Sequence, residues 1–148
     1  MFSKSTEYAL RATIYIASEA SVDKKASIVA IAKGIGAPKS FTAKILQHLT
    51  NKEKGFISST PGPSGGFYIT AEAMNKPIYS VIEAMGETGL IESCVLGLPQ
   101  CSDEHPCAMH STYKVIKMEL LKMFREKSIQ DVINSKDRMI PINYDLYK

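Results

Sequence analysis

Three cysteines and a histidine stand close together in the second half of the chain. Cys94, Cys101 and Cys107 are the only cysteines among its 148 residues, and His110 completes the pattern C-x6-C-x5-C-x2-H. Thiolates and an imidazole are ligands that soft and borderline metal centres prefer. The intervening residues are polar and rich in glycine and proline, so a bound ion or cluster would supply the order that a hydrophobic core could not. The spacing predicts a metal centre on a loop over residues 94–107.

Two other uses of these residues remain open. A Cys3His zinc site could hold the same loop as a structural element, although its intervals are longer than the usual C-x2–4-C. A thiol enzyme would need a Cys-x-x-Cys motif, or a cysteine with a base and an orienting acid, and the sequence shows neither clearly. Walker and H-E-x-x-H motifs are also absent from the sequence. We therefore expect a protein that is not an enzyme.

The composition is that of a globular protein, with 45% hydrophobic and 22% charged residues. Arg11 and Glu19 interrupt the first apolar stretch, which therefore does not resemble a signal peptide. No apolar run approaches the ~20 residues that a membrane span requires. Together with the odd number of cysteines, these observations predict a cytoplasmic protein with reduced thiols and no membrane partner.

Charge is distributed unevenly along the chain. Residues 1–60 contain nine basic and four acidic side chains, a net charge of +5, whereas the remainder contains nine basic and eleven acidic ones, a net charge of −2. A basic front half with a mildly acidic back half is typical of a nucleic-acid-binding module joined to a regulatory region.

The front half predicts three helices and a hairpin. The helices are expected over residues 3–20, 28–33 and 38–52. Ser3 and Ser27 are suitable N-caps, and Pro38 suits a first helical turn. Their inward-facing apolar residues are expected to be Leu10, Ile14 and Ala17 in the first helix, Ile28, Ile31 and Ala32 in the second, and Phe41, Ile45, Leu46 and Leu49 in the third. Strands 55–59 and 67–70 flank a Pro/Gly-rich tip.

This order of elements is typical of a helix-turn-helix followed by a wing. The outward face of the third helix and the wing tip would then contact double-stranded DNA, with lysines at phosphates or guanines and hydroxyls at backbone or base edges. The candidate DNA contacts are Lys4, Lys39, Ser40, Phe41, Thr42, Lys44, Ser59, Thr60, Ser64 and Gly65.

The back half predicts one helix over residues 77–87 and a long amphipathic helix over residues 108–127. The long helix carries more apolar surface than its own compact domain requires, so it predicts a homodimer interface. The candidate interface residues are Tyr113, Ile116, Leu120, Met123 and Phe124. A final short helix is expected over residues 129–134.

These segments together resemble the Rrf-type family of winged-helix transcription regulators, the group that contains IscR, NsrR and CymR. The resemblance is carried by SKSTEYALRA, SIVAIAKGIGAPKSFTAKILQHL, SSTPGPSGGFYIT and the cysteine pattern. It implies a mainly α fold with a small β-wing, divided into a DNA-binding domain (1–76) and a regulatory region (77–148). It also implies a homodimer that binds a palindromic operator and senses iron–sulfur status, nitric oxide, redox state or cysteine metabolism, and we expect this chain to act as a repressor.

The resemblance also implies ligands for an iron–sulfur cluster. Cys94, Cys101 and Cys107 stand where cluster-binding members keep their thiolates. His110 stands where IscR-like members place an imidazole on a [2Fe–2S] cluster, and Glu7 where NsrR-like members place an acid from the partner subunit on a [4Fe–4S] cluster. The cluster type therefore stays open. CymR-like members act through a partner enzyme instead, but typically lack the triple-cysteine loop.

Two positions depart from the family pattern. Pro61 stands where members usually carry an arginine before the glycine-rich wing tip, so minor-groove reading by an arginine is not implied here. Ala43 stands where IscR-like members carry a glutamate on the recognition helix, which removes a possible cytosine contact. The operator sequence therefore does not carry over from the family.

Overall fold

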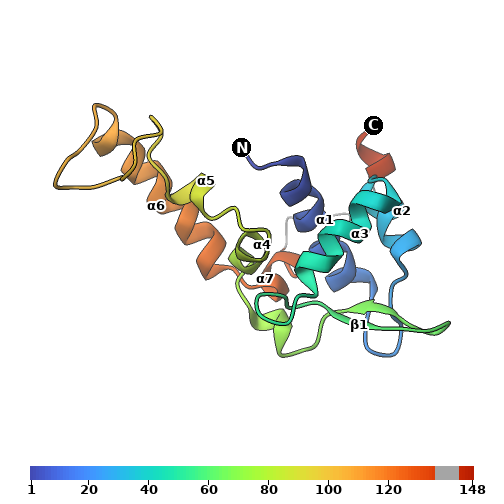
Figure 1. Ribbon diagram of the computed structural model, residues 1–148. Coiled ribbons are helices and arrows are strands. Elements are labelled where there is room, and N and C mark those ends of the chain that lie inside the picture. Colours follow the sequence, from blue (N-terminus) through green and yellow to red (C-terminus); the bar gives the residue numbers. More distant parts are fainter. Residues whose placement is uncertain (136–143) are drawn as a thin grey trace.

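A computed structural model describes residues 1–135 and 144–148 (Figure 1). The elements in chain order are α1 (Lys4–Glu19), α2 (Ile28–Ile35), α3 (Lys39–Leu49), β1 (Ser58–Thr60), β2 (Gly66–Tyr68), η1 (Ala73–Asn75), α4 (Tyr79–Ala84), α5 (Gly89–Glu92), α6 (His110–Glu126), α7 (Ile129–Ile133) and η2 (Tyr144–Tyr147). The predicted class, mainly α with a small β-wing, is confirmed. Within the described residues, none of the helices combines the length and hydropathy needed to cross a bilayer.

Local signals explain where the first helices begin and end. The Ser3 and Ser27 hydroxyls accept hydrogen bonds from the Thr6 and Ala30 N–H groups, at 3.2 and 3.1 Å, which satisfies donors that the helices leave free. Gly36 ends α2 with a φ of 65°, a left-handed conformation that favours glycine. The second helix therefore runs two residues further than expected, to Ile35, before the turn into α3.

The buried face of α1 differs from the predicted one. The fully buried side chains are Thr6, Ala9, Ala12, Thr13 and Ile16, whereas Leu10, Ile14 and Ala17 are only half-buried. Helices α2, α3, α4 and α7 all pack against α1, and such close approach selects small side chains over bulky ones. The Thr13 hydroxyl donates to the Ala9 carbonyl at 2.9 Å, which satisfies its buried polar group.

The wing is an antiparallel pair, β1 and β2, in which Ser59 lies opposite Phe67. Both strands are shorter than predicted. Phe67 also exchanges two backbone hydrogen bonds with Ala26, at 2.8 and 2.9 Å, so the turn before α2 is attached to the wing. Gly62, at the tip, has a φ of 100°, which explains a glycine in this turn.

One hydrophobic core extends across the predicted boundary at residue 76. Ile78, Val81 and Ile82 from α4 and Ile129 from α7 are buried with the side chains of α1–α3. The Ile78 N–H donates to the Lys127 carbonyl and the Ile129 N–H donates to the Lys76 carbonyl, both at 2.9 Å. The chain therefore leaves the winged body after α4 and returns to it at α7.

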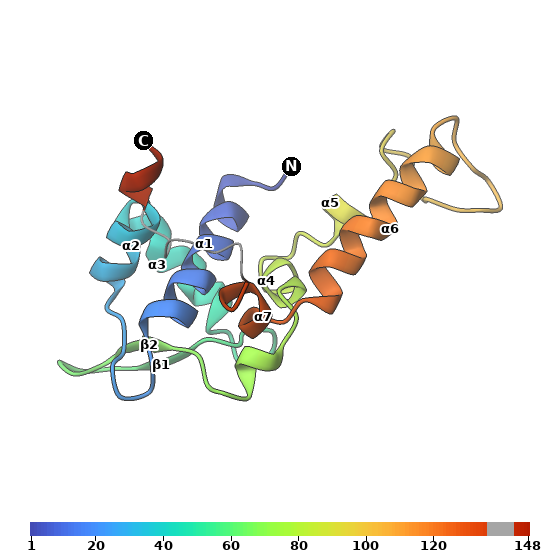
Figure 2. The same cartoon turned by 180° about the vertical axis from the view of Figure 1, so that it is seen from behind.

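Between these two points, α6 projects away from the body (Figures 1 and 2). At its base, the Phe124 ring is buried and packs edge-on against Phe2, with ring centroids 5.6 Å apart. The expectation that Phe124 faces a partner is therefore wrong, because its own subunit covers it.

The unpredicted helix α5 is tied to its neighbours through Glu92. The Glu92 carboxylate accepts hydrogen bonds from the Tyr79 hydroxyl at 2.6 Å and from Arg125 at 3.0 Å. Burial, followed by the bond to Glu92, raises the pKa of Tyr79, so this phenol stays protonated and keeps donating. The Lys117 ammonium donates to the Glu92 carbonyl at 3.0 Å. These bonds fix the segment that leads into the cysteine loop.

A capping box stabilises the first turn of α7, where the chain returns to the winged body. The Ser128 hydroxyl accepts from the Asp131 N–H and the Asp131 carboxylate accepts from the Ser128 N–H. Replacing Ser128 with Ala should lower the free energy of unfolding by about 1 kcal/mol, the usual cost of a lost N-cap. Urea denaturation followed by circular dichroism measures this change. The control is Ser111→Ala on the exposed surface of α6, and equal midpoints for the two variants would contradict the assignment.

Candidate metal centre and DNA interface

The cysteine loop joins α5 to α6 and lies at the free end of the projecting helix (Figure 1). Cys94 follows α5 and is buried, with 7% of its surface exposed, whereas Cys101 and Cys107 are half-buried. His110 is the first residue of α6 and is buried. The four predicted donors therefore all lie at one end of the molecule.

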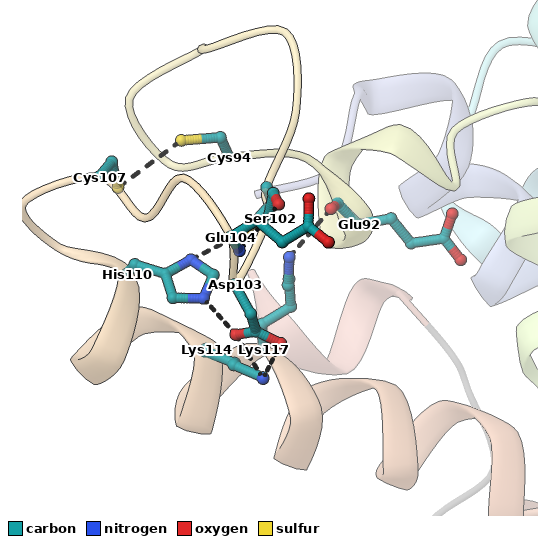
Figure 3. Close-up of polar contacts among 10 residues, drawn as sticks. Glu92, Cys94, Ser102, Asp103, Glu104, Cys107, His110, Lys114 and Lys117 are labelled. Atoms are coloured by element: carbon teal, nitrogen blue, oxygen red, sulfur yellow. Dashed lines mark hydrogen bonds and ion pairs between the residues drawn. The ribbon is translucent and has the colours of Figure 1, made fainter.

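The structure arranges these donors as two pairs. The Sγ atoms of Cys94 and Cys107 lie 3.8 Å apart and point toward one another (Figure 3). The Cys101 Sγ lies 3.6 Å from the His110 Nδ1. Over residues 1–135 and 144–148, no three histidine, cysteine or acidic side chains converge on one point in the way a bound metal ion requires. The donors are thus neighbours in pairs and do not form a single closed cage.

His110 is held by two residues that the sequence analysis did not single out. Its Nε2 lies 2.8 Å from the Asp103 carboxylate, which also accepts two 2.7 Å hydrogen bonds from the Lys114 ammonium (Figure 3). The bonds from Lys114 and then His110 lower the pKa of Asp103 to about 2. An ionised carboxylate can only accept, so the His110 Nε2–H donates to Asp103 and the Nδ1 atom faces the Cys101 sulfur.

This arrangement is the one that a metal-binding histidine needs. A carboxylate behind the ring fixes the tautomer and makes the free nitrogen a better ligand. The i, i+4 spacing of His110 and Lys114 on one helix face, with an acid in the preceding loop, is the sequence signal that could have identified Asp103.

Cys94 lies in surroundings that favour its thiolate. Backbone N–H groups of Leu98 and Leu96 point at its sulfur and lower the pKa of the thiol, with smaller contributions from Cys107 and the Lys117 ammonium. A thiolate is the form of cysteine that binds metals. The local backbone therefore prepares this residue as a ligand.

Glu7 does not join the four donors of its own chain. It lies on α1, where its carboxylate accepts a 3.2 Å hydrogen bond from the exposed ammonium of Lys4. A groove of about 840 Å³ separates the residues Met1–Ser3 from Cys94. A role for Glu7 in metal binding stays a prediction that requires a second subunit.

The outward face of α3 carries four of the ten predicted DNA contacts. Lys39, Ser40 and Lys44 are exposed. Phe41 is 47% exposed and touches Tyr8 edge-on, so its expected inward position is wrong while a DNA contact stays possible. Thr42 is fully buried and its hydroxyl donates to the Pro38 carbonyl at 3.0 Å. The prediction that Thr42 contacts DNA is therefore wrong.

The predicted wing contacts lie at the tip of the hairpin. Ser59, Thr60 and Ser64 are exposed. Gly65 donates its N–H to the Gly62 carbonyl at 2.9 Å, so this amide is not free for a phosphate. A Cβ at Gly65 would collide with the Thr60 carbonyl oxygen, which explains why glycine is needed where the two strands approach.

A second basic segment lies beside the wing and was missed by the sequence analysis. Lys24 and Lys25 precede the Ala26 bridge to Phe67, and the Lys25 ammonium lies 5.7 Å from the centre of the Tyr68 ring. These residues share a shallow surface groove with Ser64 and Gly65. Their separation in the sequence concealed the proximity, because the bridge is a tertiary contact.

Comparison with known proteins is consistent with this arrangement. The sequence profile of the Rrf2 family, described as iron-dependent transcriptional regulators, matches residues 2–135. The chain belongs to the Rrf2 family. A protein of Aquifex aeolicus (strain VF5), provisionally named an HTH-type transcriptional regulator, is 30% identical over 146 residues, covering 97% of this chain and 99% of its own.

Solved structures share the fold of this Rrf2-family chain. CymR of B. subtilis, titled the global cysteine regulator, superposes with a TM-score of 0.72 at 19% identity and covers 93% of this chain and 98% of its own. IscR of T. potens superposes with a TM-score of 0.67 at 14% identity, and the match covers 100% of this chain and 96% of the IscR chain. At these identities the likeness establishes the winged-helix fold, and the family assignment makes the chain a DNA-binding transcription regulator.

The DNA face can be tested through its salt dependence. Replacing Lys44 with Ala should weaken binding to mixed-sequence duplex DNA and reduce the slope of log K against log salt by about one, because one phosphate contact is lost. Fluorescence anisotropy at several salt concentrations gives both values. Lys122→Ala, on the remote helix α6, should leave the slope unchanged, and an equal effect of the two variants would place the DNA elsewhere.

Proposed function

We propose that this Rrf2-family regulator senses iron–sulfur or redox status through a cluster held by Cys94, Cys101, Cys107 and His110. The observation that supports this proposal is the gathering of three thiols and one oriented imidazole, as two close pairs, at one end of α6. Lysines behind the loop and backbone amides around Cys94 favour the ionised ligands that such a group requires.

The donor set fits a [2Fe–2S] cluster. Four protein ligands shared by two irons amount to two per iron, and the structure offers Cys94 with Cys107 and Cys101 with His110. A [4Fe–4S] cluster ligated by Glu7 would require the partner subunit. Such a cluster, when bound, supplies a link between loop and helix that oxidants, nitric oxide or iron shortage can remove.

We further propose that the protein acts as a homodimer through α6. Tyr113 and Leu120 are half-buried, and Ile116 and Met123 are 59% and 47% exposed. Their spacing of three and four residues places them along one edge of the helix. Exposed apolar stripes of this kind are typical of helix–helix interfaces.

The proposed regulation follows from where α6 is attached. Cys94 belongs to the segment fastened to α6 through Glu92, and His110 begins α6 itself. Ligands on both sides of the loop would hold α5, the loop and α6 as one unit. At the other end of α6, the backbone bonds from the Ile78 N–H to the Lys127 carbonyl and from the Ile129 N–H to the Lys76 carbonyl join the chain to the winged body. A change at the loop would therefore shift the population of DNA-binding arrangements.

The ligand set is tested by removing Cys101. Anaerobically purified Cys101→Ala should lose the visible absorption and the bound iron and sulfide of the parent protein, because one iron loses a ligand. His105→Ala, an exposed change within the same loop, should keep both. Unchanged colour and iron in Cys101→Ala would refute the assignment, and stoichiometric zinc without sulfide in the parent protein would replace the cluster by a structural zinc site.

The dimer is tested by placing a charge on the exposed stripe. Ile116→Glu should convert the dimer into a monomer in sedimentation velocity, with unchanged circular dichroism, because burying an unpaired carboxylate in an interface is costly. Lys122→Glu, on the same helix but outside the stripe, should remain dimeric. A dimeric Ile116→Glu protein would exclude this face as the interface.

A further inference from the structure

We propose that the cluster-free protein carries a selective dithiol switch, in which Cys94 and Cys107 form an intramolecular disulfide with a small disulfide oxidant while Cys101 stays a thiol. The observation that supports this proposal is the 3.8 Å separation of the Cys94 and Cys107 sulfurs. The chemistry needs no metal. Only its consequence for cluster loading rests on the function proposed above.

The loop geometry selects one of three possible pairings. Cys101 faces the His110 ring at 3.6 Å, whereas over residues 1–135 and 144–148 the pair of thiols in contact is Cys94 and Cys107. A disulfide requires the facing sulfurs to approach to about 2.05 Å. Cys94 and Cys107 both lie outside helices, after α5 and before α6, so side-chain rotation and small loop movements can close the gap.

Burial determines the order of the two steps. Cys107 is half-buried and is the sulfur that a solution oxidant reaches, whereas Cys94 is only 7% exposed. The Cys107 thiolate attacks oxidised glutathione, forming a mixed disulfide and releasing one glutathione thiolate. The Cys94 thiolate then attacks the Cys107 sulfur and releases the second glutathione. The two protons lost by the protein thiols protonate the two glutathione molecules, and the protein is oxidised by two electrons.

The disulfide would remove one of the two donor pairs. Because cysteine binds metal as a thiolate, an oxidised loop could not receive a cluster until a reductant reopened it. If the cluster is lost under oxidising conditions, the loop would then form the reversible Cys94–Cys107 disulfide. Reassembly of the cluster would require a reductant as well as iron.

The experiment uses full-length protein stripped of metal under anaerobic, reducing conditions and then treated with oxidised glutathione. Free thiols are alkylated and the protein is cleaved after glutamate, so that Glu104 separates Cys107 from the other two cysteines. Mass spectrometry should find the Cys94–Cys107 link and alkylated Cys101, a loss of two of the three titratable thiols. A link through Cys101, or three free thiols, would overturn the proposal.

Three variants separate the steps. Cys101→Ala should form the same link, while Cys94→Ser should accumulate a glutathione adduct on Cys107. Cys107→Ser should leave the buried Cys94 unmodified; a stable adduct on Cys94 in that variant would reverse the proposed order and contradict it. Iron and sulfide loading of the reduced parent protein is measured separately, so a protein that loads a cluster but forms no disulfide refutes this inference alone.

Discussion

The backbone pairing between residues 76–78 and 127–129 is the constraint on which the arrangement of the molecule depends. It holds the residues just before α4 against the residues just before α7. Helix α4 stays packed in the winged body, whereas the segment that contains α5, the cysteine loop and α6 extends from it and is held at its base by these bonds and by buried side chains such as Ile129 and Phe124. The C-terminal end of α6 is therefore attached to the winged body, whereas its N-terminal end, next to the cysteine loop, projects away from it.

The candidate metal ligands are concentrated at the N-terminal end of α6 and in the loop that precedes it. Charged side chains there are arranged in series, with Lys114 holding Asp103, Asp103 holding His110, and His110 facing Cys101. Each contact orients the next group, so the ring of His110 is held with its Nδ1 atom toward the Cys101 sulfur. Preparing ligands in this way reduces the reorganisation that binding would otherwise require.

Sequence patterns predicted the features that depend on local interactions. The Ser3 and Ser27 caps, the glycine turn before α3 and the hairpin all involve residues a few positions apart. Periodicity and residue types supplied the order of the elements and the candidates Cys94, Cys101, Cys107 and His110, and the family resemblance added Glu7. The two donor pairs join residues at most thirteen positions apart, so spacing alone could indicate that they lie on one loop.

Features set by tertiary packing escaped prediction. The inward face of α1 is lined by alanine and threonine because four helices crowd it, so the larger apolar residues gave the wrong orientation. Thr42 and Phe41 exchanged expected positions on α3, since periodicity alone does not fix the rotation of a short helix. Phe124 was assigned to a partner because its own partner, Phe2, lies more than a hundred residues away in the sequence.

The two backbone bonds between Ala26 and Phe67 have a consequence for how this regulator approaches a duplex. They join the turn that carries Lys24 and Lys25 to the hairpin as a partial third strand, so these lysines lie beside the wing. A change in the length of that turn would shift Lys24 and Lys25 relative to the hairpin. The number of residues between the end of α1 and Ala26 therefore determines where Lys24 and Lys25 lie along the wing.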